Sequence, residues 1–279
     1  MKKRISRRGY VRYAGSSMVV VAGASAGAYY LGRHRSTPAS RRNRVGETDE
    51  ISPGGRYLLP LPRFTRGVVG EAVAWRRSIR EYRDEPIPVE QLSELLWAAQ
   101  GVNELKHRLR TVPSAGATYP LELYVVAGDG GVLVDKGRYL PAGSYKYDRR
   151  DHSLVLVALG DLRERLAGAS LNQEWVKNAP INIVICAVYE RTTVRYGERG
   201  LRYVYMEVGH VGQNIYIVAS ALGLGTVAVG AFHDGQVKTV LGAEAKEEPL
   251  YVMPVGVPEE PYRISEEDLS DNFQKMRRS

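Results

Sequence analysis

The sequence predicts an α+β fold in which helices flank a mixed β-sheet, because short apolar stretches and amphipathic stretches follow one another along it. Residues 121–128, 181–189 and 250–257 are short and rich in apolar residues, which is typical of strands, and two of them are apolar enough to be buried on both faces. Between the last two, residues 203–222 repeat apolar side chains at intervals of three and four, which predicts a long helix.

Two further helices are expected near the start of the folded domain, which begins close to Gly67. Residues 68–77 form the first. Pro86-Ile87-Pro88 then leads into the second, in which apolar side chains keep helical spacing until Gly101 ends the run: Val89, Leu92, Leu95, Leu96 and Ala99. In the 203–222 helix, Ile217 and Ala221 extend a second apolar face, so this helix is predicted to be buried on both sides.

Charge and cysteine content argue against two classes of protein. The net charge is +8, but eleven basic residues precede the first acidic one, Glu47; from residue 46 onward 28 basic residues face 31 acidic ones, a net charge of −3. So neutral a body lacks the basic surface that nucleic-acid binding requires. A single cysteine, Cys186, excludes an intrachain disulfide and is predicted to be a buried small hydrophobe, and no metal site is expected at His152 or His233.

The first 45 residues are predicted to be a basic leader and linker, ahead of one folded domain over 46–279. Residues 14–32 carry no charge and are long enough for a membrane span, and Arg7-Arg8 ahead of them is similar to a twin-arginine export signal. We therefore expect the protein to be exported or anchored at the cell envelope. A disordered basic arm on a cytoplasmic protein is the alternative.

The stretch RRSIREY, residues 76–82, concentrates cations around one serine. In an extended chain Arg76, Ser78 and Arg80 point the same way, so they can follow an anionic, polyhydroxylated ligand along its length. The planar guanidinium grips phosphate oxygens with two parallel hydrogen bonds. A solvated run of surface charge explains the same residues without a ligand.

Two loops of small residues are also candidates for ligand contact. PSAGATYP, residues 113–120, allows the backbone to approach a flat ligand closely, although turn formation before a strand is an equal explanation. LGLGTVAVGAF, residues 222–232, leads from a helix end into a short apolar segment. Neither a dinucleotide fingerprint nor a P-loop is present, so a phosphate ligand would be held differently.

Taken in order and spacing, RRSIREY, PSAGATYPLELYVV, YGERGLRYVYMEVGHVGQNIYIVASALGLG and TVAVGAF resemble the FMN-dependent nitroreductase family, and in particular its branch of azoline (thiazole and oxazole) dehydrogenases. The resemblance covers residues 58–258. It implies a nitroreductase-like fold, an intertwined homodimer with FMN at the interface, and NADH or NADPH as a possible electron donor.

The resemblance also implies which residues bind FMN. Arg76, Arg77 and Ser78 would contact its phosphate and ribityl chain, and Arg80 would lie near N1 and O2, where a cation stabilises charge that develops on reduction. The backbone at Gly230 and Ala231 would face N5. The remaining predicted contacts are a loop reaching across the subunit boundary, an amide near the ribityl or pyrimidine edge, and a second phosphate contact: Pro113, Ser114, Ala115 and Gly116; Asn172 or Gln173; and Arg263.

The activity so implied is hydride transfer through flavin N5 to a small conjugated acceptor, such as a nitroaromatic or a quinone, in a ping-pong cycle without an assigned catalytic side chain. One alternative is oxidation of azoline rings in peptides, for which Arg195-Tyr196 stands where a Lys-Tyr pair is expected. Another is a non-catalytic flavin-fold binding protein. Substrate choice is expected to depend on residues 129–150 and 190–202.

Polar residues on the 203–222 helix admit two interpretations. Glu207, His210, Gln213 and Asn214 are candidates for catalysis, but a buried, internally satisfied network that fixes helix packing is the preferred one. The roles of Glu207, His210, Arg195 and Tyr196 stay open at this point.

Overall fold

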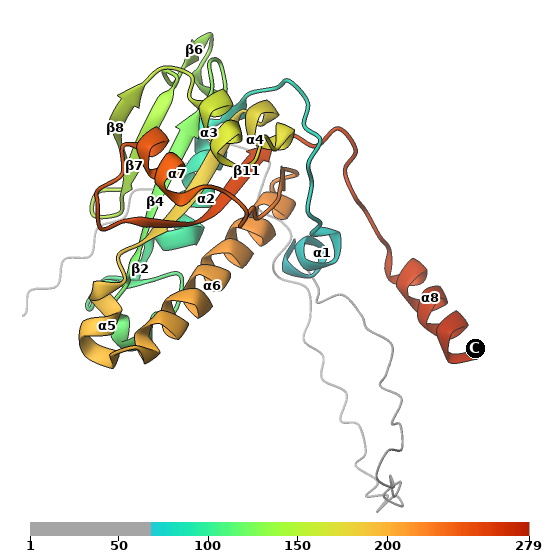
Figure 1. Cartoon of the computed structure of the whole chain (residues 1–279). Helices are drawn as coiled ribbons and strands as arrows, with labels where there is room; N and C mark the ends of the chain where they lie inside the picture. Colours follow the sequence, from blue (N-terminus) through green and yellow to red (C-terminus); the bar gives the residue numbers. More distant parts are fainter. Residues whose placement is uncertain (1–67, 279) are drawn as a thin grey trace, which may run out of the picture. The chain divides into compact units, whose positions relative to one another are not determined.

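A six-stranded sheet forms the centre of the fold in a computed structural model that describes residues 68–278 (Figure 1). Each neighbouring pair of strands is antiparallel. In spatial order the strands are β10 (Gly225–Thr226), β11 (Glu248–Gly256), β9 (Ile181–Ala187), β4 (Leu121–Ala127), β7 (Gly143–Asp148) and β8 (Ser153–Leu159). The chain therefore returns repeatedly to the middle of the sheet, where its most apolar strands lie.

Both faces of the central strands are buried, and side chains alternate between them. Leu123 and Val125 of β4 pack on one face with helices α2 (Val89–Gln100) and α6 (Arg199–Ala221). Tyr124 and Val126 belong to a second core on the other face, covered by α3 (Arg163–Ala169), α4 (Glu174–Asn178) and α7 (Asp234–Leu241). This double burial explains why β4 and β9 carry apolar side chains on both faces instead of alternating, with Glu122 and Asn182 as buried polar exceptions.

Smaller elements complete the fold around these layers. Two of them matter for the site: helix α1 (Val68–Trp75) packs along α6, and helix α5 (Glu190–Tyr196) precedes it. The others are β1 (Ile87–Pro88), β5 (Val132–Asp135) and β6 (Arg138–Tyr139), which form one small sheet, β2 (Val102–Glu104) and β3 (Leu109–Arg110), which form another, the 3-10 turn η1 (Ala115–Ala117), and helix α8 (Glu266–Arg278).

The α+β prediction is confirmed, and the predicted elements recur with small shifts of their ends. The first helix stops at Trp75, two residues early, and the long helix begins at Arg199, four residues before its predicted start. Cys186 is fully buried, as expected. Strands β7 and β8 are additional to the predicted elements, because no strand was predicted between residues 129 and 180.

Helix α6 is buried on one side only within a single chain, which corrects the prediction of burial on both sides. Val204, Val211 and Ile215 are fully buried, whereas Tyr205 and Met206 are 55% and 53% exposed. The polar residues predicted to form a buried network on this helix differ in their burial. Glu207 is buried, Asn214 is half-buried and donates to the carbonyl of Ala98 at 2.8 Å, and both His210 and Gln213 are exposed.

The predicted leader lies outside the described residues, and so do the apolar segment 14–32 and the Arg7-Arg8 pair. Within residues 68–278, no helix combines the length and the apolar character that crossing a membrane demands.

Candidate functional site

The arginine-rich stretch leaves helix α1 at Trp75 and continues as an extended chain beside the end of α6. Ser78 forms a parallel bridge with Thr226, and the N–H of Ile79 donates to the carbonyl of Thr226 at 2.9 Å. The side chain of Ile79 lies against Gly225, where a Cβ atom would come within 2.7 Å of it. Glycine at 225 is therefore required for the two segments to lie this close.

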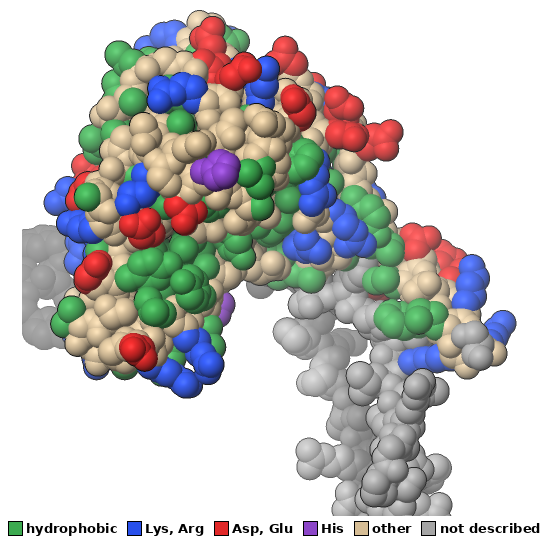
Figure 2. Space-filling view, in the orientation of Figure 1, with side chains coloured by type: hydrophobic (Ala, Val, Ile, Leu, Met, Phe, Trp, Pro, Cys, Tyr) green, Lys and Arg blue, Asp and Glu red, His purple; other side chains and the backbone are tan. Residues whose placement is uncertain are grey.

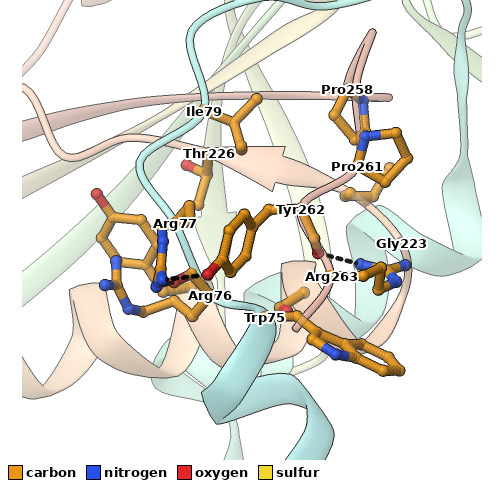
Figure 3. Close-up of a pocket in the computed structure, with 13 residues that line it drawn as sticks. Trp75, Arg76, Arg77, Ile79, Gly223, Thr226, Pro258, Pro261, Tyr262 and Arg263 are labelled. Atoms are coloured by element: carbon orange, nitrogen blue, oxygen red, sulfur yellow. Dashed lines mark hydrogen bonds between the residues drawn. The ribbon is translucent and has the colours of Figure 1, made fainter. Parts of the chain in front are cut away.

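Each of four arginines in this region lies over an aromatic ring. The guanidinium carbon of Arg76 is 5.2 Å from the centroid of Tyr216. That of Arg80 is 5.4 Å from Trp175. The other two pairs are Arg77 over Tyr262 at 3.9 Å and Arg263 over Trp75 at 4.2 Å (Figure 3). Rings orient guanidinium groups without neutralising them.

No carboxylate compensates this charge among the residues that the structure describes. Arg76, Arg77, Arg80 and Arg263 form no ion pair there. Glu81 and Glu260 line a hollow together with Arg77 and Arg80 but are not ion-paired with them. Arginines elsewhere in the body, such as Arg150 and Arg163, are paired with aspartates. Figure 2 shows basic side chains gathered over the chain between α1 and α4. The arrangement suits an anionic ligand.

Two recesses flank the extended stretch. One is a narrow cavity of about 20 Å³ lined by Trp75, Arg76, Arg77 and Arg263, among others (Figure 3). The second is an open hollow of about 540 Å³ lined by Arg77, Ser78, Ile79, Arg80, Glu81, Glu260, Pro261 and Tyr262. Thr226 also lines the narrow cavity, and its buried hydroxyl oxygen has no hydrogen-bond partner among the residues that the structure describes. An unsatisfied buried hydroxyl beside free cations is consistent with a ligand-binding role.

Gly230 and Ala231 lie in the segment that follows β10, and the structure brings Gln173 to them. The amide Nε2 of Gln173 donates to the carbonyl of Ala231 at 3.0 Å and to that of Ser170 at 2.8 Å. Both Gly230 and Ala231 are exposed, and their N–H groups have no partner among residues 68–278. Two adjacent backbone donors are thus available to a ligand acceptor.

Tyr216 is a site residue that sequence reasoning missed. Its hydroxyl accepts a hydrogen bond from the N–H of Ala228 at 2.8 Å and lies 3.0 Å from Ser78 Oγ. It therefore connects the arginine stretch with the segment leading to Gly230. In the sequence Tyr216 lies among the apolar residues of α6. Its place in the predicted helix, next to Ile215, was the one signal that it faces the interior.

The predicted loop at Pro113, Ser114, Ala115 and Gly116 contacts other elements. Gly116 has φ +59, a conformation that favours glycine, and its carbonyl accepts from Arg195 Nη1 at 3.2 Å. A Cβ atom at Gly116 would lie 2.4 Å from the hydroxyl of Tyr196. Ser114 faces Glu207. Glu207 precedes Tyr216 of the arginine site by nine residues in α6, which separates the two by roughly 13 Å along the helix axis. Within one chain, this loop is separate from the arginine site.

Glu207 of α6 is buried beside this loop and faces Gln100 of α2. Burial raises the pKa of its carboxyl to about 7, and the facing groups Ser114, Arg110 and Gln100 only partly oppose that shift. Its Oε1 atom and the Nε2 atom of Gln100 have no hydrogen-bond partner within residues 68–278. The expected internally satisfied network is therefore incomplete at Glu207.

Comparison with known proteins identifies the class to which this fold and site belong. The nitroreductase family model matches residues 73–257, most of the described chain. The chain therefore belongs to the nitroreductase family, whose members are oxidoreductases.

Individual relatives agree with that assignment. A protein of Methanocaldococcus jannaschii named as a candidate nitroreductase is 46% identical over 203 residues, which cover 73% of this chain and 98% of that protein. The microcin B17-processing protein McbC of Escherichia coli is 26% identical over 140 residues, 49% of this chain and 50% of that protein.

Solved structures show the same fold. A candidate nitroreductase from Ralstonia eutropha superposes with a TM-score of 0.59 at 30% identity, covering 72% of this chain and 89% of the other. The E. coli microcin synthetase McbBCD complex with truncated pro-MccB17 bound contains a chain that matches with a TM-score of 0.57 at 20% identity, over 81% of this chain and 80% of that one.

Proposed function

We propose that this protein is an FMN-dependent oxidoreductase that passes hydride from a donor such as NADH or NADPH to a small conjugated acceptor, in the manner of a nitroreductase. The observation that carries the proposal is the set of four arginines that are held by aromatic rings and have no acidic partner in the described part of the chain. A dianionic phosphate and an isoalloxazine that becomes anionic on reduction both need such charge.

The residues fit FMN group by group. Arg76, Arg77 and Arg263 would hold the phosphate, and Ser78 a ribityl or phosphate oxygen. Arg80, backed by Trp175, would lie near N1 and O2, where its charge favours the reduced form. The free N–H groups of Gly230 and Ala231 would face N5, and Gln173 holds their segment in place.

When bound, FMN would supply the redox chemistry, the acceptance and return of hydride at N5 in a ping-pong cycle. The chain's own residues bind the cofactor, orient it and stabilise charge. No side chain need exchange a proton at N5 for this role.

We further propose that two copies of the chain form a homodimer that completes each site. The exposed apolar residues of α1 and α6 support it: Val69, Val73, Tyr205 and Met206 are each more than half exposed. The loop at Pro113, Ser114, Ala115 and Gly116 would then reach the FMN of the other copy, which accounts for its separation from the arginine site. Size-exclusion chromatography with light scattering tests this proposal, and a monomer that retains flavin would contradict it.

Oxidation of azoline rings in a peptide is a second candidate function. Arg195 and Tyr196 lie against Gly116 of the predicted flavin loop, and the processing proteins of microcin B17 and trifolitoxin are among the relatives. A guanidinium is a poor proton acceptor, which favours the reductase. Anaerobic incubation of the oxidised protein with an azoline peptide would decide: bleaching of the flavin supports the dehydrogenase.

The absorbance spectrum of the purified protein is the decisive experiment for the cofactor. A visible flavin band that bleaches on anaerobic addition of NADH or NADPH is expected. A protein without flavin, even after incubation with FMN, would overturn the proposal and favour a non-catalytic binding protein. We also propose that residues 14–32 direct export or anchoring, which fractionation of cells expressing the full chain would test.

A further inference from the structure

Tyr216 lies where the two segments of the proposed FMN site meet. One segment is the extended stretch around Ser78, and the other runs from Thr226 to Gly230. Backbone pairing between Ile79 and Thr226 holds the segments side by side, and the Tyr216 hydroxyl lies within hydrogen-bond distance of a group in each segment.

Hydrogen-bond accounting gives these contacts a direction. The N–H of Ala228 can only donate, so the Tyr216 oxygen accepts there. The phenol then has one hydrogen of its own to place, and among the described residues its near neighbour is Ser78 Oγ at 3.0 Å. Donation from Tyr216 to Ser78 satisfies that hydrogen, whereas the reverse direction would leave it without an acceptor.

Ser78 is left with a free donor as a result. A serine hydroxyl has one hydrogen, and an oxygen that already accepts from Tyr216 directs its hydrogen elsewhere. Ser78 also lines the open hollow together with Arg77 and Arg80. The free hydrogen therefore belongs to the same recess as two unpaired guanidinium groups.

We infer that Tyr216 is a positioning residue of the cofactor site: a relay from Ala228 N–H through the Tyr216 hydroxyl turns Ser78 outward as a hydrogen-bond donor to an oxygen of bound FMN. This inference rests on the proposed function. It assigns Ser78 a donor role and predicts that the Tyr216 and Ser78 hydroxyls act as one unit.

A double-mutant cycle on FMN binding tests that unity. FMN dissociation constants would be measured by flavin fluorescence for the parent, Tyr216→Phe, Ser78→Ala and the double variant. Loss of one net hydrogen bond corresponds to roughly fivefold weaker binding. Each single variant is expected to lose about that factor, and the double variant no more than the worse single one.

The outcomes separate the inference from the proposed function. If the fold-losses of FMN affinity in the two single variants multiply in the double variant, the two hydroxyls act independently and Tyr216 contributes only packing. That result would overturn the relay but not the proposal that the protein binds FMN. Equal affinity of Tyr216→Phe and the parent would overturn it too. A parent that binds no FMN overturns the proposed function and the relay together.

Two controls guard against a loss of fold. Tyr145→Phe makes the same change in β7, where the hydroxyl donates to the carbonyl of Pro141 at 2.6 Å, and should leave FMN affinity unchanged. If Tyr216→Phe fails to fold, Ser78→Thr against Ser78→Ala replaces it. Threonine keeps the donor and should retain affinity, and equal affinity of Ser78→Ala and the parent would refute the donor role.

Discussion

The guanidinium of Arg263 lies over the indole of Trp75, 4.2 Å from the ring centroid, while the indole Nε1 donates to the carbonyl of Ile264 at 3.2 Å. Residues nearly two hundred positions apart thus hold each other at the cavity that Arg76 and Arg77 also line. Trp75 fixes both the side chain and the backbone of the C-terminal segment, so Arg263 presents its charge in a defined place.

Arg263→Gln should weaken FMN binding roughly tenfold, the loss of one charge-assisted phosphate contact. Riboflavin lacks the phosphate, so its affinity should be unchanged by the same substitution. Titration of both flavins by fluorescence measures the contrast. Equal losses for FMN and riboflavin would contradict a phosphate contact at Arg263.

Arg76→Ala combined with Arg80→Ala should purify with at least about tenfold less flavin per chain than the parent, because neither cation has an acidic partner among residues 68–278. Absorbance of flavin released by denaturation gives the ratio. The matched control is Arg138→Ala with Arg150→Ala, two exposed arginines already paired with Asp135 and Asp148. Equal flavin content in the two double variants would remove Arg76 and Arg80 from the site.

The structure brings together segments that the sequence proposed as FMN contacts, whereas the residues that support those segments were not proposed. Gln173 and Gly230–Ala231 were both proposed as FMN contacts, and they are joined by a hydrogen bond. Trp175 and Tyr216, which hold Arg80 and Arg76, were not proposed, because a ring that supports an arginine looks like any core aromatic in a sequence. Such pairings depend on contacts between distant segments, which local periodicity does not encode.

Strands β7 and β8 illustrate the same limit. Gly143–Asp148 contains a lysine and an aspartate, and Ser153–Leu159 is apolar but largely exposed at the edge of the sheet. Neither resembles the doubly buried strands that the pattern found. They form because β7 pairs with β4 and β8 pairs with β7, and such pairing depends on contacts between segments distant in the sequence.

Gly225→Ala should destabilise the protein by about 1–3 kcal/mol, because the new Cβ atom would overlap Ile79, whose Cγ2 and Cβ lie 2.7 and 2.8 Å from it. Ile79→Ala in the same chain should restore part of the loss by making room. Chemical denaturation measures both. Gly235→Ala is the control, since a Cβ atom there meets nothing within 4 Å, and a comparable loss at that position would contradict the steric explanation.

Glu207→Gln should change how stability depends on pH. In the folded chain burial raises the pKa of Glu207 to about 7 from an ordinary value of 4.5. The unfolded chain therefore releases this proton first as pH rises, so the free energy of unfolding falls between pH 4.5 and 7.

Glutamine carries no such proton, so the free energy of unfolding of the variant should not fall in this way. The difference in this free energy between variant and parent should therefore rise from pH 4 to pH 8, by on the order of 3 kcal/mol. Urea unfolding at the two pH values gives the difference. A parent whose loss of stability from pH 4 to pH 8 equals that of Glu207→Gln would show that the carboxyl is charged and satisfied at neutral pH.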